Sequence, residues 1–178
     1  IQSVGLTLYM EMLERAVKAI QKGEQPNLDQ PLHSGPEVNL RLPALIPDDY
    51  LPDVHGRLML YTRLASAADN DELREQQVEM IDRFGLLPEP TKNLIRQTQL
   101  KLQADKLGIL KIDAGPNGGR IEFSPKTPID PMRLIQLIQS QPKRYRFEGA
   151  TQFRFTLPMD TNEERFAMLE GLLNQLSE

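Results

Sequence analysis

The spacing of apolar side chains changes along the chain, from a helical repeat in the first part to a mixture of repeats in the second. Apolar positions that recur every three or four residues predict helices in residues 4–22, 54–67, 70–84, 89–107, 132–141 and the segment after Thr161. Alternating polar and apolar positions predict strands in residues 37–42, 109–113, 120–123, 145–148 and 151–157.

Capping residues sharpen the ends of these helices. Asp69 followed by Glu72 has the spacing of a capping box, with Asp in place of Ser or Thr. Gly85 is the expected stop of the same helix, because glycine tolerates the backbone conformation that ends helices. Other side chains placed to accept hydrogen bonds from a first helical turn are Asp53, Asp130 and Thr161.

The sequence Gly-Pro-Asn-Gly-Gly at residues 115–119 separates two predicted strands. Asn117-Gly118 is a strong signal for a tight turn, so we expect a β-hairpin here. Helices come first, and strands mixed with helices follow. This order predicts an α+β fold in which a helical cluster packs with a small, mainly antiparallel sheet.

Proline and glycine between residues 24 and 36 interrupt every periodic pattern and indicate a linker. We therefore expect a connector helix and linker in residues 1–35 and one α+β domain in residues 36–178. Because the chain begins with Ile1 and enters a helical pattern almost at once, we expect it to be a piece of a longer polypeptide.

The predicted helix 70–84 has one apolar and one acidic side. At 100° per residue, one side carries Leu73, Gln77, Met80, Ile81 and Phe84. The opposite side carries Glu72, Glu75, Glu79 and Asp82. Taken alone, this pattern favours a solvated acidic face, and a contact surface is the alternative.

Composition excludes several classes of function. The 178 residues carry a net charge of -4, which does not favour nucleic-acid or membrane binding. Cysteine is absent, so there is no disulfide framework and no thiol nucleophile. No apolar run approaches the roughly 18 residues that a membrane span requires. We expect a soluble, cytoplasmic protein without a membrane partner.

Candidate catalytic and metal-binding groups are few. No Walker A loop occurs in the sequence, and the glycines at 115–119 lack the lysine that would follow. Asp48, Asp49 and Asp53 are too few to form a calcium loop. His33 and His55 have no neighbouring serine or carboxylate pattern that would make them bases. We expect no catalytic residue, no cofactor and no metal site.

Basic residues cluster near the predicted strands 145–148 and 151–157. Arg144 and Arg146 would share one face of a strand, and Arg154 could join them. Tyr145 and Phe147 alternate with the arginines and are expected to point into the core. A solvated sheet face is the favoured interpretation, and a nucleic-acid-binding accessory domain that uses these three arginines is the alternative.

Three segments carry a resemblance to a known family: residues 4–10 (VGLTLYM), 42–50 (LPALIPDDY) and 79–88 (EMIDRFGLLP). Together they resemble the C-terminal region of the bacterial transcription-repair coupling factors. The similarity spans nearly the whole chain, including residues 106–109 and the Gly118-Gly119 hairpin, and it is loosest in the last helix.

The resemblance implies a regulatory domain without catalytic activity. In that family the C-terminal domain docks on an N-terminal UvrB-like module of the same protein and masks its UvrA-binding surface. By resemblance, the intramolecular interface here would include Glu79, Asp82 and Arg83. Residues 1–22 would be the connector from a preceding translocase region.

The resemblance also implies the properties of a longer parent protein. The parent would use ATP and Mg to move along duplex DNA, displace stalled RNA polymerase and recruit nucleotide excision repair through UvrA. None of these cofactors would bind to the present chain.

Overall fold

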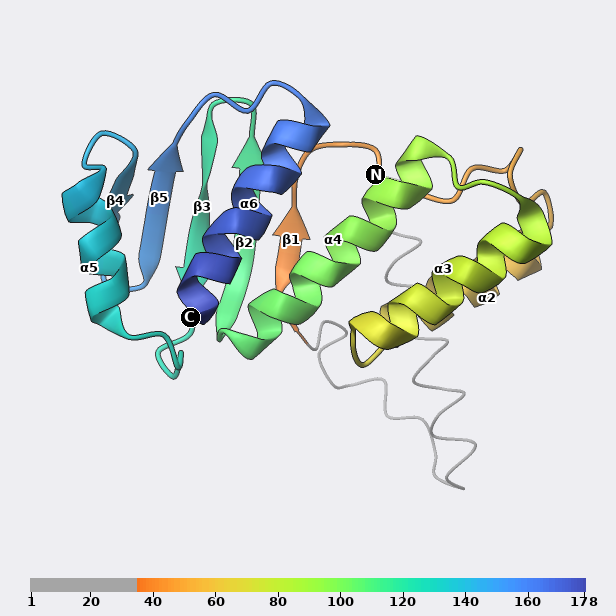
Figure 1. Ribbon diagram of the computed structural model, residues 1–178, viewed down its shortest axis with the longest axis horizontal. Coiled ribbons are helices and arrows are strands. Elements are labelled where there is room, and N and C mark those ends of the chain that lie inside the picture. The colour runs from red at the N-terminus through yellow and green to blue at the C-terminus, as the bar shows by residue number, and fades with distance from the viewer. Residues whose placement is uncertain (1–34) are drawn as a thin grey trace. The chain divides into compact units, whose positions relative to one another are not determined.

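The computed structural model describes residues 35–178, which form two compact units (Figure 1). The helical unit contains Pro43–Thr98, and the sheet unit contains residues 35–42 and Gln99–Glu178. The predicted helix 4–22, its linker and His33 lie outside the described residues, so the domain boundary expected near Gly35 stays a prediction. Residues 36–178, expected to be one domain, contribute to both units.

Three helices make up most of the helical unit. They are α2 (Val54–Ala65), α3 (Asn70–Phe84) and the first half of α4 (Glu89–Lys106), which continues into the sheet unit. The predicted caps are present, since the Asp53 carboxylate accepts a hydrogen bond from the Gly56 N–H at 3.2 Å. The buried apolar side chains of this unit include Leu60, Leu64, Leu73, Met80, Leu87 and Ile95.

The proline-rich segment 43–52 contains a turn but no helix or strand. Side chains from the helices satisfy its backbone. The Tyr61 hydroxyl accepts a hydrogen bond from the Ile46 N–H at 2.6 Å. Thr91 donates to the carbonyl of Leu45 at 3.0 Å, and Asn93 donates to that of Pro43 at 2.9 Å. Hydrogen bonds from individual polar side chains therefore help to fix the segment 43–52 to the helices of this unit.

The sheet unit is built on five strands in the order β1-β2-β3-β5-β4. Their bounds are Glu37–Asn39 (β1), Ile109–Gly115 (β2), Gly118–Phe123 (β3), Tyr145–Phe147 (β4) and Gln152–Thr156 (β5). β1 pairs in parallel with β2, and the other three pairs are antiparallel. The predicted α+β class with a mainly antiparallel sheet is confirmed.

One face of the sheet is covered by α5 (Pro131–Ser140), α6 (Asn162–Ser177) and the second half of α4 (Figure 1). The core between them contains the fully buried rings of Phe153, Phe155 and Phe166. Arg165 of α6 is also buried, and its guanidinium donates to the carbonyls of Leu40 at 2.7 Å and Met159 at 3.0 Å. The sheet unit thus combines an aromatic core with a buried cation that ties α6 to the chain after β1.

The β-hairpin predicted around residues 115–119 is confirmed, with its turn between β2 and β3. Gly115 pairs with Gly118, so the turn residues are Pro116 and Asn117 instead of Asn117 and Gly118. Because proline fixes a negative φ, Pro116 in the first turn position excludes a type I′ turn there, which requires a positive φ at both turn residues. The positive φ, 137°, belongs to Gly118, where a Cβ atom would collide with the carbonyl oxygen of Phe155.

Candidate interaction surface on helix α3

The position of α3 is set by its cap and its buried side. The Asp69 carboxylate accepts a hydrogen bond from the Glu72 N–H at 2.9 Å, as the capping box predicts. The Glu72 carboxylate in turn accepts a hydrogen bond at 2.8 Å from the N–H of Ala68, one residue before the cap. Leu73 and Met80 are buried, and the helix ends at Gly85, whose φ is 96°. These contacts fix which sides of α3 are exposed.

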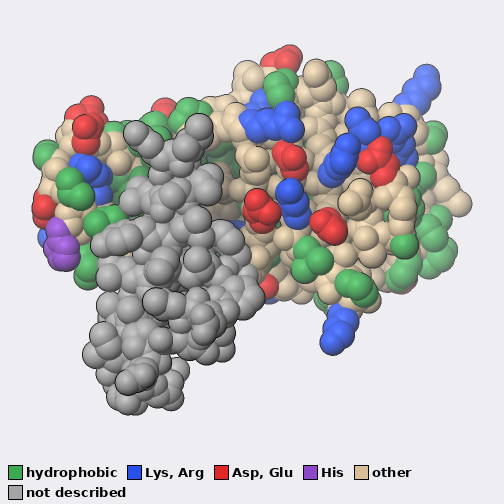
Figure 2. Space-filling model, turned by 180° about the vertical axis from the view of Figure 1, so that it is seen from behind, with side chains coloured by type: hydrophobic (Ala, Val, Ile, Leu, Met, Phe, Trp, Pro, Cys, Tyr) green, Lys and Arg blue, Asp and Glu red, His purple; other side chains and the backbone are tan. Residues whose placement is uncertain are grey.

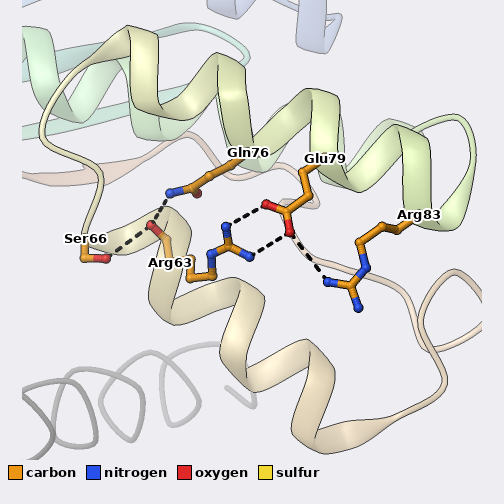
Figure 3. Close-up of polar contacts among 5 residues, drawn as sticks. All are labelled: Arg63, Ser66, Gln76, Glu79 and Arg83. Carbon is orange, nitrogen blue, oxygen red and sulfur yellow. Dashed lines mark hydrogen bonds and ion pairs between the residues drawn. The ribbon is translucent and has the colours of Figure 1, made fainter.

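Glu79 faces α2 instead of sharing the exposed side with Glu75 and Asp82, as the helical spacing predicted (Figure 3). Its two carboxylate oxygens accept hydrogen bonds from the Arg63 guanidinium at 2.6 and 3.3 Å, and Arg83 approaches at 3.6 Å. The hydrogen bonds from Arg63 lower the pKa of Glu79 below its ordinary value, and the charge of Arg63 adds to this effect. Glu79 is therefore an ionised partner of α2.

Further contacts join α2 and α3 at the same place. The Gln76 amide donates to the Arg63 carbonyl at 2.9 Å, and the Ser66 hydroxyl donates to that carbonyl at 3.2 Å (Figure 3). Hydrogen bonding to Glu79 correspondingly raises the pKa of Arg63. The sequence pattern did not reveal this network, because it depends on which side of α3 packs against α2.

Asp82 and Arg83 lie at the exposed C-terminal end of α3. Among the described residues, the Asp82 carboxylate has no hydrogen-bond or ion-pair partner, and its side chain is exposed. The Arg83 guanidinium lies 5.0 Å from the centroid of the Phe84 ring while it contacts Glu79. Leu86, one residue beyond the end of the helix cap, is 86% exposed. This end of α3 therefore presents an available carboxylate, a guanidinium and an apolar side chain together.

The outer side of α3 contains one apolar residue that sequence reasoning missed. Val78 is 54% exposed and lies with Asp71, Arg74 and Glu75 around a shallow surface depression. The signal was present in the sequence, because Val78 falls at helical spacing from Asp71, Glu75 and Asp82. The outer side of α3 is thus acidic with an apolar centre.

The structure separates the three arginines of the alternative basic site. Arg146 and Arg154 lie opposite each other on β4 and β5, whereas Arg144 precedes β4 and is half-buried. Both aromatic residues of β4 point toward the core, as predicted, since each ring contacts the buried ring of Phe153. Tyr145 is buried, but Phe147 is 40% exposed because β4 is the edge strand of the sheet.

The remaining candidates do not assemble a further site. Within residues 35–178, no group of three or more His, Cys, Asp or Glu side chains is placed to hold a metal ion. Asp48, Asp49 and His55 are exposed in the helical unit. No helix in the described part of the chain is long and apolar enough to cross a membrane.

Comparison with known proteins supports the family resemblance seen in the sequence. The TRCF domain family matches residues 40–134. The transcription-repair-coupling factors of Haemophilus influenzae and Escherichia coli K12 are 46% and 43% identical over 177 residues, which is 99% of this chain and 15% of each relative. The chain thus spans about a seventh of the length of these relatives.

A solved structure also shares the fold. The crystal structure of the C-terminal domain of a transcription-repair coupling factor superposes with a TM-score of 0.67 at 22% identity. The match covers 81% of this chain and 91% of that one. The resemblance found in the sequence is confirmed, and because the family match extends over more than half of the residues, the chain belongs to the TRCF domain family.

Proposed function

We propose that this chain is the non-catalytic, autoinhibitory domain of a transcription-repair coupling factor. It docks on an N-terminal UvrB-like module of the same protein and masks the surface that would bind UvrA. The parent is a DNA translocase that uses ATP and Mg, displaces stalled RNA polymerase from duplex DNA and recruits nucleotide excision repair. The names of the relatives support the parent's role in coupling transcription to repair.

The observation that carries the docking surface is the exposed end of α3. Asp82 has an available carboxylate beside Arg83 and Leu86, so a partner can gain an ion pair and an apolar contact there without breaking any interaction of Asp82 among the described residues. Glu79 differs, because a partner would have to share it with Arg63 and Arg83. We therefore assign Asp82 the direct contact and Glu79 the task of holding Arg83 in place.

The contact between a regulatory domain and its partner module must be stable enough to form and weak enough to be released. Exposed ion pairs contribute about 0.2–1 kcal/mol each, which is too little to bind two separate proteins tightly. Tethering in one polypeptide raises the effective concentration of the partner and makes such contacts sufficient. Release then requires only a modest competing interaction.

The experiment is a binding titration of this chain against the separate N-terminal UvrB-like module. We expect Asp82→Lys to weaken binding by about threefold to thirtyfold, because reversal removes one exposed ion pair and adds a repulsion of similar size. The matched control is Asp105→Lys, which makes the same change of charge at an exposed position of α4 in the sheet unit. Equal loss in both variants would indicate a general charge effect, and unchanged binding of Asp82→Lys would refute the assignment.

A further inference from the structure

Within residues 35–178, the face of the sheet on the side away from α4, α5 and α6 is open. Figure 2 shows Lys and Arg side chains there, grouped around a few Asp and Glu side chains. The alternation of the strands explains the separation, since Ile112, Ile121 and Phe153 point into the core and their neighbours point to the open face. The charged side chains of this face therefore project from strands that backbone hydrogen bonds hold in fixed positions.

Three arginines occupy one row across this face. In the strand register, Arg120 of β3 is opposite Arg154 of β5, and Arg154 is opposite Arg146 of β4. Arg120 is not among the arginines predicted to cluster, because only the pairing of distant strands brings it beside the other two. Like charges placed directly opposite each other are unfavourable, so this row requires an anion.

Glu148 supplies part of that negative charge. Its carboxylate contacts Arg154 at 2.7 Å, Arg146 at 3.2 Å and Arg120 at 3.6 Å. The hydrogen bond from Arg154 lowers the pKa of Glu148, and the charges of all three arginines act in the same direction. One carboxylate balances only one of the three cations, so the row keeps an excess of positive charge.

A shallow depression of about 470 Å³ adjoins the row. Arg41, Arg120 and Arg154 line it together with the hydroxyl-bearing Thr156 and the backbone of the turn at residues 115–119. Arg41 reaches the Asp113 carboxylate at 3.4 Å. The depression thus collects guanidinium groups from three separate segments of the sheet unit.

The depth of the charges differs by sign. The side chains of Arg41, Arg120 and Arg146 are 58–62% exposed and that of Arg154 is 38% exposed, whereas those of Glu148 and Asp113 are 26% and 33% exposed. The carboxylates lie low and orient the guanidinium groups above them. Each guanidinium has five donors, so most N–H groups remain available to a ligand. The next row of the sheet, Glu37, Lys111 and Glu122, alternates in sign, and its one lysine between two glutamates gives it a net negative charge.

We propose that the arginine row and its adjoining depression form a docking site for an acidic protein segment that presents two neighbouring carboxylates. Four arginines face two carboxylates at this site, Asp113 and Glu148, which leaves an excess of two positive charges. Guanidinium groups bind carboxylates through two parallel hydrogen bonds, and the fixed spacing of the strands selects carboxylates on adjacent side chains.

A nucleic acid fits the same site less well. Phosphate backbones gain affinity from many cations in register, whereas the cations here are few and interleaved with carboxylates. Single-strand binding also requires exposed rings for base stacking, whereas Phe153 and Phe155 are buried, and the 40% exposed Phe147 packs against Phe153 on the face opposite to the arginines. The charge balance therefore favours a small number of carboxylates over a polyanion.

The test is an NMR titration that follows the arginine side-chain Nε–H signals of the chain at low ionic strength. The probe is a blocked pentapeptide, Gly-Glu-Asp-Glu-Gly, compared with its amide counterpart Gly-Gln-Asn-Gln-Gly. We expect saturable shifts of the signals of Arg41, Arg120 and Arg154 with the acidic peptide only. The double substitution Arg120→Gln and Arg154→Gln is expected to weaken binding by about twofold to thirtyfold, the size of two exposed ion pairs.

The matched control is the double substitution Lys126→Gln and Lys143→Gln, which removes the same charge from exposed loops of the same unit. Unchanged backbone amide spectra show that each variant is folded. Equal shifts with both peptides, or equal loss of affinity in both double variants, would overturn the proposal. A 12-base-pair DNA duplex that binds more tightly than the acidic peptide would overturn it in favour of nucleic-acid binding.

Discussion

The helical unit and the sheet unit satisfy their backbones in different ways. In the sheet unit, the ladder of β1 to β5 pairs the strand backbones with one another, and the side chains on the open face are not needed for that purpose. In the helical unit, the irregular segment 43–52 depends on Tyr61, Thr91 and Asn93 to bind its N–H and carbonyl groups.

This difference determines where each unit has surface available for binding. Polar side chains of the helical unit are largely committed to its own structure, and even Glu79, which the pattern placed on an exposed side, is held by Arg63. Among the described residues, its available surface includes the outer side and the end of α3. The open face of the sheet unit is available along a whole row, because its side chains carry charge without supporting the backbone.

The largest expected effect concerns the aromatic core of the sheet unit. Phe153 is fully buried and contacts Phe123, Tyr145 and Phe147. Phe153→Ala is therefore expected to lower the free energy of unfolding of this unit by about 3–5 kcal/mol through lost contacts and a cavity. Urea denaturation followed by circular dichroism, with hydrogen exchange to locate the loss, measures the effect.

The control for this substitution is Phe147→Ala on the neighbouring strand, which removes a ring that is already 40% exposed. Its cost is expected to be well below that of Phe153→Ala, because burial sets the size of the effect. Similar losses in the two variants would show that the edge strand β4 is as important to the core as β5.

A smaller effect is expected from removing one polar tie in the helical unit. Thr91→Val keeps the shape of a fully buried side chain but leaves the Leu45 carbonyl without its hydrogen bond. The expected cost is about 1–3 kcal/mol, the penalty for an unsatisfied buried group. Hydrogen exchange of the helical unit measures it, and the exposed neighbour Lys92→Ala serves as the control. Equal protection in Thr91→Val and the unaltered chain would show that the segment 43–52 does not need this tie.

Local signals in the sequence predicted the elements closely. The caps Asp53, Asp69, Asp130 and Thr161 all accept the expected hydrogen bonds. The hairpin lies within the predicted segment 115–119, although its turn residues are Pro116 and Asn117 and not the Asn-Gly pair that signalled it. Caps and periodicity act within a few residues, which is why one sequence is enough to recognise them.

The candidate sites depend on contacts between distant residues and were harder to predict. Periodicity placed Glu79 with the exposed acids, since nothing near it in the sequence reveals the bidentate contact with Arg63, sixteen positions away. Arg120 was missed for the same reason, because it meets Arg154 only through strand pairing. Asp82 was placed correctly at an exposed position, but its docking role stays a prediction that rests on resemblance.

The smallest expected effect concerns the tie between α2 and α3, whose partners Arg63 and Glu79 are both about 40% exposed and therefore screened by solvent. Hydrogen bonding to Arg63 lowers the pKa of Glu79 in the folded state, so its contribution to stability is fully present above the ordinary glutamate pKa. That contribution is lost as the pH falls through the lower pKa that Glu79 has in the folded state.

Glu79→Gln is therefore expected to reduce the melting temperature slightly near neutral pH, and the difference from the unaltered chain should shrink below about pH 4. Thermal melts at a series of pH values measure it, with Glu75→Gln on the exposed side of α3 as the control for loss of one negative charge. If the difference in melting temperature stays constant down to pH 3, Glu79 supports α2 through packing instead of charge. The helical unit would then depend on polar side chains less than its hydrogen bonds suggest.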